Sequence, residues 1–238
     1  MIRLDKLIGE LNIASRSEAK SLIKNGRIKV NGIVAKSGQE KIDETTAVIT
    51  YDNKDYSYIK FRYFVMYKPS NVVTANIDNL DVTVMDLFRK AYPDLNKDYN
   101  PVGRLDKDTT GLLLITNDGI LGHRLLSPKH HVPKTYEVTI KKPLSNEDIS
   151  RIETGIKLKD FTTLPAKIDL VDDYHCLLTI TEGKFHEVKR IFIALDNEVI
   201  SLHRISFGPL ILDDGMKSGD IIELEESSIK ELTSEKDN

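Results

Sequence analysis

The sequence predicts an α+β protein made of a small N-terminal domain and a larger C-terminal domain. Apolar residues at helical spacing mark two short helices within residues 4–24, and an Asn-Gly pair at 31–32 then favours a hairpin. After residue 59, short apolar or alternating runs typical of strands outnumber the helical patterns. The polar run 52–55 separates the two parts, so we expect domains at 1–52 and 59–232.

The composition is that of an ordinary globular protein and excludes several other classes. Of the 238 residues, 40% are hydrophobic and 30% are charged, and no run approaches the ~20 apolar residues that a membrane span needs. The N-terminus lacks the apolar segment of a signal peptide. The single cysteine, Cys176, cannot form an internal disulfide and fits a reducing compartment. We therefore expect a cytoplasmic protein with no membrane partner.

The formal net charge of −3 is unevenly distributed along the chain. Residues 213–238 hold nine acidic and three basic side chains, whereas residues 1–41 hold nine basic and four acidic ones. The basic N-terminal part can therefore face phosphates while the acidic tail stays in solvent. A negative total charge consequently does not exclude a nucleic-acid partner.

The N-terminal residues contain signals for two helices and a hairpin. Leu4, Leu7, Ile8 and Leu11 form the apolar face of a first helix. The run Ser15-Arg16-Ser17-Glu18 is a capping-box pattern, which predicts that a second helix begins there. The Asn-Gly pair at 25–26 ends that helix, and residues 27–34 then read as a hairpin.

Basic residues recur every four positions along the second helix and indicate an RNA-contacting face. A stripe of this kind is often only a solvated helix surface. Here it coincides with basic residues in the hairpin, and the strings 3–6, 15–19 and 26–32 resemble the S4 RNA-binding domain over most of residues 1–48. Phosphate contacts of this kind position a protein without reading sequence. The RNA-binding residues we expect are Arg3, Lys6, Arg16, Lys20, Lys24, Arg27 and Lys29.

Apolar periodicity gives the elements of the C-terminal domain in order. Strands are expected at 63–67, 112–116, 134–140, 166–171, 176–181 and 202–210. Helices are expected at 84–91, 121–126, 149–152 and 188–195, with a last short acidic helix that frays. Pro69 ends the first strand because proline cannot donate to a ladder, and Pro93 stops the first helix.

A dense charged run, Gly103–Gly111, stands immediately before the apolar strand 112–116. Charged side chains avoid burial unless they are paired, so composition alone favours a solvated loop in which Arg104 and Lys107 balance two aspartates. The string itself, Gly-Arg-Leu-Asp-x-Asp-Thr-Thr-Gly-Leu, resembles the signature loop of the RNA pseudouridine synthases, in the branch typified by the bacterial 16S rRNA enzyme and its large-subunit relatives. The resemblance implies that Asp106 is the catalytic residue.

Two more motifs resemble the same family. Lys134-Thr135-Tyr136 matches a Lys-x-Tyr motif, which implies that Tyr136 stacks on the target uracil. Residues 182–191 match a third motif, in which a basic residue pairs with the catalytic aspartate, and Lys189 occupies that place. Glu187 stands where the family has Gln, and Ile191 where it has Met. We expect the carboxylate of Glu187 to raise the pKa of Lys189 or to compete for it.

The resemblances cover nearly the whole chain and imply a fold and a reaction. The family fold is a mixed, mainly antiparallel sheet with flanking helices. The implied reaction converts one uridine of ribosomal RNA, in the small-subunit 16S rRNA, to pseudouridine after base flipping. Arg104, two residues before Asp106, would fill the gap left by the flipped base or hold a phosphate. Two alternatives stay open: a 23S rRNA synthase of the same branch, and a non-catalytic S4-containing ribosome-assembly protein.

The sequence predicts no cofactor and no metal. There is no GxGxxG or Walker loop, and an isomerisation needs neither a redox change nor an energy input. His123, His130 and His131 suggest a metal site, but no Cys pair or HExxH spacing supports one. The expected partner is ribosomal RNA in a ribosome-assembly intermediate, and the expected oligomeric state is a monomer.

Overall fold

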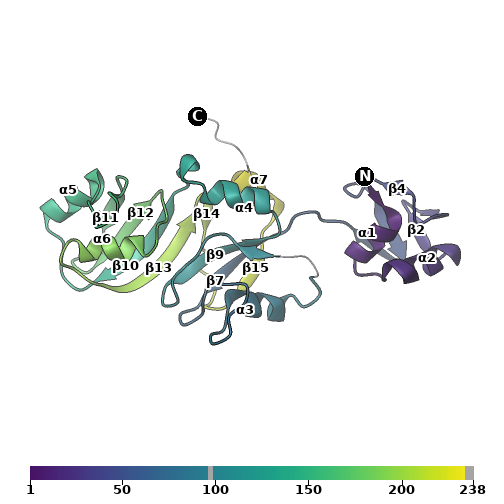
Figure 1. Cartoon of the computed structure of the whole chain (residues 1–238), viewed down its shortest axis with the longest axis horizontal. Helices are drawn as coiled ribbons and strands as arrows, with labels where there is room; N and C mark the ends of the chain where they lie inside the picture. The colour runs from purple at the N-terminus through teal and green to yellow at the C-terminus, as the bar shows by residue number, and fades with distance from the viewer. Residues whose placement is uncertain (96–98, 234–238) are drawn as a thin grey trace. The chain divides into compact units, whose positions relative to one another are not determined.

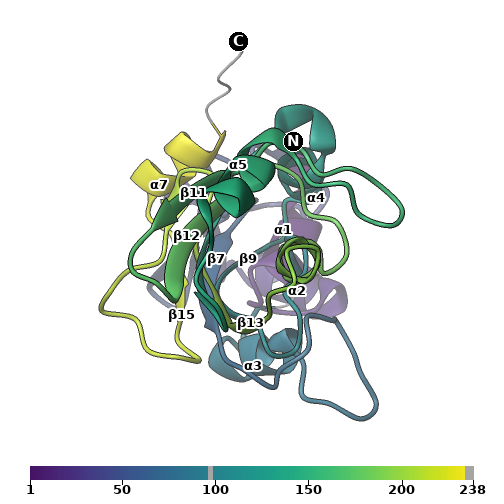
Figure 2. The same ribbon diagram turned by 90° about the vertical axis from the view of Figure 1, so that its left-hand side faces the viewer.

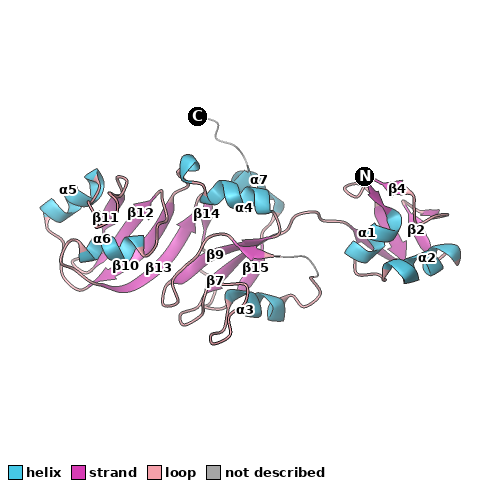
Figure 3. Cartoon of the chain, viewed as in Figure 1, coloured by secondary structure: helices cyan, strands magenta, loops and turns pink. Residues whose placement is uncertain are grey.

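The computed structural model of the chain describes residues 1–95 and 99–233, and its contacts divide into two units. Unit 1 holds Met1–Phe61 together with the short segment that begins at Tyr92. Unit 2 holds Arg62–Ala91 and the chain from Tyr99 onward. Figure 1 shows both units, and Figure 3 distinguishes their helices from their strands. The α+β prediction is confirmed, because each unit contains both kinds of element.

Unit 1 is built from the two predicted helices and a small antiparallel sheet that contains the predicted hairpin. Its helices are α1 (Leu4–Glu10) and α2 (Arg16–Lys24). The side chain of Ser15 accepts the backbone N–H of Glu18, and the carboxylate of Glu18 accepts the backbone N–H of Ser15, which confirms the capping box. The core beneath both helices consists of Leu4, Leu7, Ile8, Ala19, Ile23, Ile28, Ala35 and Ile49.

The sheet of unit 1 has the order β3-β2-β5-β6, and a separate pair joins β1 (Ile2–Arg3) to β4 (Lys41–Ile42). The sheet strands are β2 (Ile28–Val30), β3 (Ile33–Val34), β5 (Val48–Tyr51) and β6 (Lys54–Ser57). Asn31 and Gly32, both at positive φ, connect β2 to β3. Asp52 and Asn53 connect β5 to β6, so the expected domain limit at residue 52 falls inside a hairpin turn. The boundary between the two compact units follows Phe61 instead. The domain ranges 1–52 and 59–232 stay predictions.

Unit 2 is organised by one mixed sheet of order β11-β12-β10-β13-β9-β7-β15. Its strands are β7 (Tyr63–Lys68), β9 (Thr110–Thr116), β10 (Lys134–Ile140), β11 (Lys167–Leu170), β12 (His175–Ile180), β13 (Val199–Phe207) and β15 (Ile221–Glu223). The short strands β8 (Asn100–Pro101) and β14 (Leu210–Ile211) pair with β9 and β13. Among the described residues, β13 pairs with β9 in parallel and the other neighbours are antiparallel, which confirms the mainly antiparallel mixed sheet.

Helices flank this sheet at the expected places. They are α3 (Val84–Ala91), α4 (Gly119–Leu126), the 3-10 turn η1 (Pro128–His130), α5 (Asn146–Thr154), α6 (Glu187–Ile193) and α7 (Glu226–Thr233). The helix α5 lies at the end of unit 2 that carries β11 and β12 (Figures 1 and 2). Within the two described stretches of chain, no helix is both long and apolar enough to cross a membrane.

Gly111, in β9, occupies a position that only glycine can fill. Its φ is +104°, and a Cβ built there would lie 2.2 Å from the carbonyl oxygen of Arg204. The two residues are partners in the parallel ladder between β9 and β13. This close approach fixes the start of β9, and with it the end of the charged loop 103–111.

Replacing Gly111 by alanine should therefore destabilise the protein. We expect Gly111→Ala to lower the free energy of unfolding by at least about 2 kcal/mol, because the backbone of Arg204 cannot move out of the sheet and the φ is unfavourable for a side chain. Urea denaturation measures the change. Gly119→Ala is the matched control, since no atom lies within 4 Å of its built Cβ. An equal loss in both variants would contradict this account of Gly111.

Candidate active site

The charged loop 103–111, called the signature loop below, is fixed by the end of β7. Lys68, the last residue of β7, is fully buried, and its Nζ donates to the carbonyl oxygens of Pro69 at 3.0 Å, Lys107 at 3.3 Å and Thr109 at 2.8 Å. The backbone N–H of Asn71 donates to the same Lys107 carbonyl at 2.8 Å. The loop backbone is therefore held against β7 from the side of its carbonyl groups.

Thr74 adds a second attachment to the loop. Its hydroxyl donates to the carbonyl oxygen of Leu105 at 2.8 Å and lies 3.2 Å from the backbone N–H of the same residue. Burial lowers the pKa of Lys68 to about 8, against an opposing effect of Asp108 and Asp106. Lys68 thus remains mainly charged at neutral pH, and it lies close enough to both aspartates to act on them electrostatically.

Asp106 faces two side chains that α6 and the turn before it supply. The Nζ of Lys189 lies 3.1 Å from Oδ2 of Asp106 and 2.6 Å from Oδ1 of Asp108. The Nε2 of His186 lies 3.4 Å from the other carboxylate oxygen of Asp106. Asp106 and Lys189 are both about three-quarters buried, whereas Asp108 is mostly exposed. The ammonium group of Lys189 therefore bridges two carboxylates of the signature loop.

These contacts determine the charge states that the site favours. Burial acts to lower the pKa of Lys189, but hydrogen bonds to Asp108 and Asp106 outweigh it and the pKa is raised. The hydrogen bond from Lys189 lowers the pKa of Asp108. An ammonium group between two carboxylates stabilises the charged form of each partner.

The four residues expected to carry the chemistry line one small open pocket of about 60 Å³. Asp106 and Arg104 come from the signature loop, Tyr136 from β10 and Lys189 from α6. Tyr136 is almost fully buried, and Arg104 is exposed. The strands meet here because β10 and β9 both flank β13 in the sheet. The structure thus brings together side chains from three segments that are distant in the sequence.

The expectation that Glu187 competes for Lys189 is wrong. Glu187 is buried, and its Oε2 accepts the backbone N–H of Lys184 at 2.7 Å. The partners of Lys189 are Asp106 and Asp108 instead. Sequence reasoning missed this because Glu187 begins α6, where its side chain can fold back onto the preceding turn.

Three further residues of the site were not assigned a role from the sequence. Asp108 looked like solvated charge, although its spacing two residues from Asp106 matches the family string. His186 belongs to the third motif, and only the structure places it beside Asp106. Lys68 precedes a proline at a strand end, and nothing local indicates that its ammonium group is buried.

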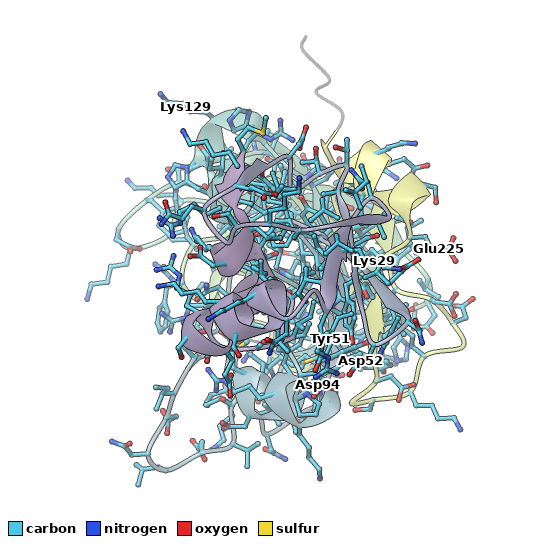
Figure 4. All side chains as sticks on the ribbon, turned by 90° about the vertical axis from the view of Figure 1, so that its right-hand side faces the viewer. Lys29, Tyr51, Asp52, Asp94, Lys129 and Glu225 are labelled. Atoms are coloured by element: carbon cyan, nitrogen blue, oxygen red, sulfur yellow. The ribbon has the colours of Figure 1, made fainter. Side chains whose placement is uncertain are left out.

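The seven residues expected to bind RNA are all exposed on unit 1. Arg3, Arg16 and Lys20 line one surface depression, and Lys20 and Lys24 line a second one together with Lys36, which the sequence did not single out. Two of the seven are held by carboxylates within unit 1. Arg3 bonds the buried Asp5 at 2.6 Å, and Arg27 pairs with Asp52 beside the ring of Tyr51. Lys29, Tyr51 and Asp52 are labelled in Figure 4.

Comparison with protein-family models gives two matches that follow the order of the two units. A model described as RNA pseudouridylate synthase matches residues 62–194. A model described as S4 domain matches residues 2–48. The first match spans the signature loop, β10 and α6, and so contains every side chain placed around Asp106 above. The second contains α1, α2 and the β2–β3 hairpin.

Individual relatives cover almost the full length of the chain. An uncharacterized RNA pseudouridine synthase of Bacillus subtilis is 42% identical over 96% of this chain and 97% of its own. The ribosomal small subunit pseudouridine synthase A of Haemophilus influenzae is 39% identical, with 97% and 99% covered. A crystal structure of a pseudouridylate synthase superposes with a TM-score of 0.68 at 39% identity, covering 98% of this chain and 100% of that one. The chain belongs to the RNA pseudouridylate synthase family, and its N-terminal residues carry an S4 domain.

Proposed function

We propose that this protein converts a uridine of the small-subunit 16S ribosomal RNA to pseudouridine, with Asp106 as the catalytic residue. The observation that carries the proposal is the pairing of Asp106 with Lys189 in a pocket that Tyr136 also lines. Full-length relatives named ribosomal small subunit pseudouridine synthase A support the choice of RNA. The substrate would be an assembly intermediate of the ribosome, and the enzyme a cytoplasmic monomer.

Each pocket residue has a separate part in the proposed reaction. The N-glycosidic bond of the uridine breaks, the uracil turns, and a carbon–carbon bond to the same ribose forms, so that no atom and no electron is gained or lost overall. Asp106 acts as an ionised carboxylate, and the ammonium group of Lys189 lies 3.1 Å from it. Tyr136 offers an aromatic face on which the uracil can stack.

The target base has to leave its helix before it can reach this pocket. Unstacking and unpairing a base costs a few kcal/mol, which contacts to the flipped nucleotide and its neighbours must offset. Arg104 lines the pocket and is exposed, so its guanidinium group can bind a phosphate or occupy the space of the departed base. The basic face of unit 1 adds phosphate contacts elsewhere on the RNA.

The first test removes the charge of the proposed catalytic residue. Asp106→Asn keeps the size of the side chain, so we expect near-normal RNA binding and no detectable pseudouridine. Asp108→Asn is the matched control: it removes the other carboxylate that contacts Lys189, and should cost less than about tenfold in rate because Asp106 keeps its cation. Carbodiimide-dependent primer extension on 16S and 23S rRNA measures the product. Turnover by Asp106→Asn well above background, or modification of 23S rRNA alone, would overturn the assignment.

The second test removes the bridging cation. Lys189→Met leaves two neighbouring carboxylates without a positive partner, so the pair binds a proton more readily and the ionised form is lost at higher pH. We expect a lower single-turnover rate and an acidic limb of the pH–rate profile that moves upward. Lys189→Arg restores the charge and should retain most of the rate. A profile that Lys189→Met leaves unmoved would show that this lysine does not support Asp106.

The third test concerns the basic face of unit 1. Reversing the charges of Arg16, Lys20 and Lys24 should weaken RNA binding. The negative slope of log affinity against log salt should become shallower by about two to three units, because fewer counterions are released. The charge-preserving set Arg16→Lys, Lys20→Arg and Lys24→Arg should keep the slope. Fluorescence anisotropy at several salt concentrations gives both values. If the reversed set kept the original slope, the stripe would be ordinary solvated surface.

A further inference from the structure

An aromatic side chain stands exposed at the edge of the active-site pocket. Phe185 has a relative exposure of 72%, although its two chain neighbours, Lys184 and His186, both line the pocket. Among the phenylalanines and tyrosines that the structure describes, only Phe185 and Tyr174 are exposed, and Tyr174 belongs to the turn between β11 and β12. An apolar ring left in water forgoes the stabilisation that burial gives, and the roles proposed for the other pocket residues do not explain it.

The ring of Phe185 is stacked on the imidazole ring of His186. The two ring centres are 3.7 Å apart and the ring planes differ by 20°, a spacing similar to the ~3.4 Å between successive bases of one nucleic-acid strand. His186 covers one face of the phenylalanine ring, so the high exposure of Phe185 requires that the other face is open. The Nε2 of His186 lies 3.4 Å from Oδ1 of Asp106. The two rings therefore lead from the carboxylate of Asp106 to the open edge of the pocket.

The backbone around the two rings is held in place by the start of α6. The side chain of Glu187 accepts the backbone N–H of Lys184 at 2.7 Å, and the backbone N–H of Glu187 donates to the Lys184 carbonyl at 3.1 Å. The carbonyl oxygen of His186 accepts the backbone N–H of Arg190 at 2.9 Å. His186 itself has a φ of 51°, a left-handed conformation that is uncommon outside glycine and is found at functional sites. A ligand that stacks here would not have to order the turn.

Chain connectivity determines which ligand can reach the open face of Phe185. When the target uridine enters the pocket, its two phosphates still join it to the nucleotides on either side, which must therefore pass the edge of the pocket. Tyr136, inside the pocket, is the residue proposed to stack on the target uracil itself. The open face of Phe185 is thus left for a neighbouring base, and unstacked bases of RNA bind to aromatic side chains in this way.

We propose that Phe185 is a positioning residue: its ring, stacked on His186, forms a platform for the base of a nucleotide adjacent to the target uridine. The inference rests on the proposed function, because it requires a flipped base in the pocket. Stacking on the platform offsets part of the stacking that is lost when the target leaves its helix. Because every base has an aromatic face, the platform fixes the path of the strand without reading its sequence.

The test is a double-mutant cycle between the ring and the RNA. The full chain carries Asp106→Asn, so that no turnover occurs, and the RNA is the fragment in which the wild type forms pseudouridine. An abasic nucleotide replaces one neighbour of the target at a time, and fluorescence anisotropy measures Kd. Removing the base on one of the two sides should weaken binding by about five- to 150-fold, as expected for a base stacked on an aromatic ring. Phe185→Ala should weaken binding of intact RNA similarly, and the same abasic change should then cost less than about twofold.

Three further variants show whether the aromatic face itself is responsible. Phe185→Tyr keeps the ring and should retain both the affinity and the coupling to the abasic position. Phe185→Leu keeps an apolar side chain without a ring and should lose most of both. Tyr174→Ala removes the other exposed aromatic residue, on the β11–β12 turn, and should change neither. Thermal unfolding checks that each variant is folded.

The outcomes distinguish the platform from the proposed function. Additive effects of Phe185→Ala and of the abasic change at both neighbours would overturn the inference, because ring and base would not be in contact. Coupling to an abasic target instead of an abasic neighbour would also overturn it, since the ring would then face the target uracil. Failure of the proposed function appears differently, as the absence of pseudouridine from 16S rRNA treated with the wild type.

Discussion

The active site depends on the buried ammonium group of Lys68. Removing an ammonium ion from water costs several kcal/mol unless other groups replace its hydration. Three carbonyl oxygens do so here, and two of them belong to Lys107 and Thr109 of the signature loop. If the loop opened, the ammonium group of Lys68 would lose two of these three partners. The cost of an unsatisfied charge therefore favours the one loop conformation that places Asp106 in the pocket, although few apolar side chains of the loop itself are buried.

The same lysine contributes to the electrostatics of the site from one side, while α6 contributes from the other. Lys68 acts on Asp106 and Asp108 from the end of β7, and Lys189 contacts both carboxylates directly. Loop and helix come from segments more than 70 residues apart, and the sheet order brings them together because β9 lies beside β13 and β13 beside β10. The glycine at 111 is part of this arrangement, since any side chain there would push β9 away from Arg204. Long-range strand pairing thus places Asp106 and the buried Tyr136 in the same pocket.

Local features of the fold were predictable because their causes lie within a few residues. The capping box at Ser15 and the alternation of residues 134–140, whose side chains are buried at every second position, depend only on neighbouring sequence. The sheet order and the parallel pair of β9 and β13 were not predictable in this way, because they depend on contacts between distant segments. The polar run 52–55 suggested a domain boundary, and in the structure its first two residues form the hairpin turn between β5 and β6, since boundaries and hairpin turns share the same polar composition. The family resemblance identified Asp106, Tyr136 and Lys189, whereas the roles of Asp108, His186 and Lys68 became visible only in the structure.

On both sides of the pocket, a buried ionisable side chain holds the backbone of a loop. On the β7 side, a buried cation donates to loop carbonyl groups; on the α6 side, buried carboxyl groups accept backbone N–H groups of Lys184 and Leu164. Loops have backbone groups without ladder partners, and a buried ionisable side chain can satisfy several of them at once. A buried lysine can donate to three carbonyl groups at once only while it is protonated, so the geometry on the β7 side of the site is linked to pH. Burial moves the pKa of Lys68 down to about 8 and that of Glu187 up to about 7. Lys68 can donate to all three carbonyl groups only while it is protonated, so its hold on the signature loop weakens as the pH rises through about 8.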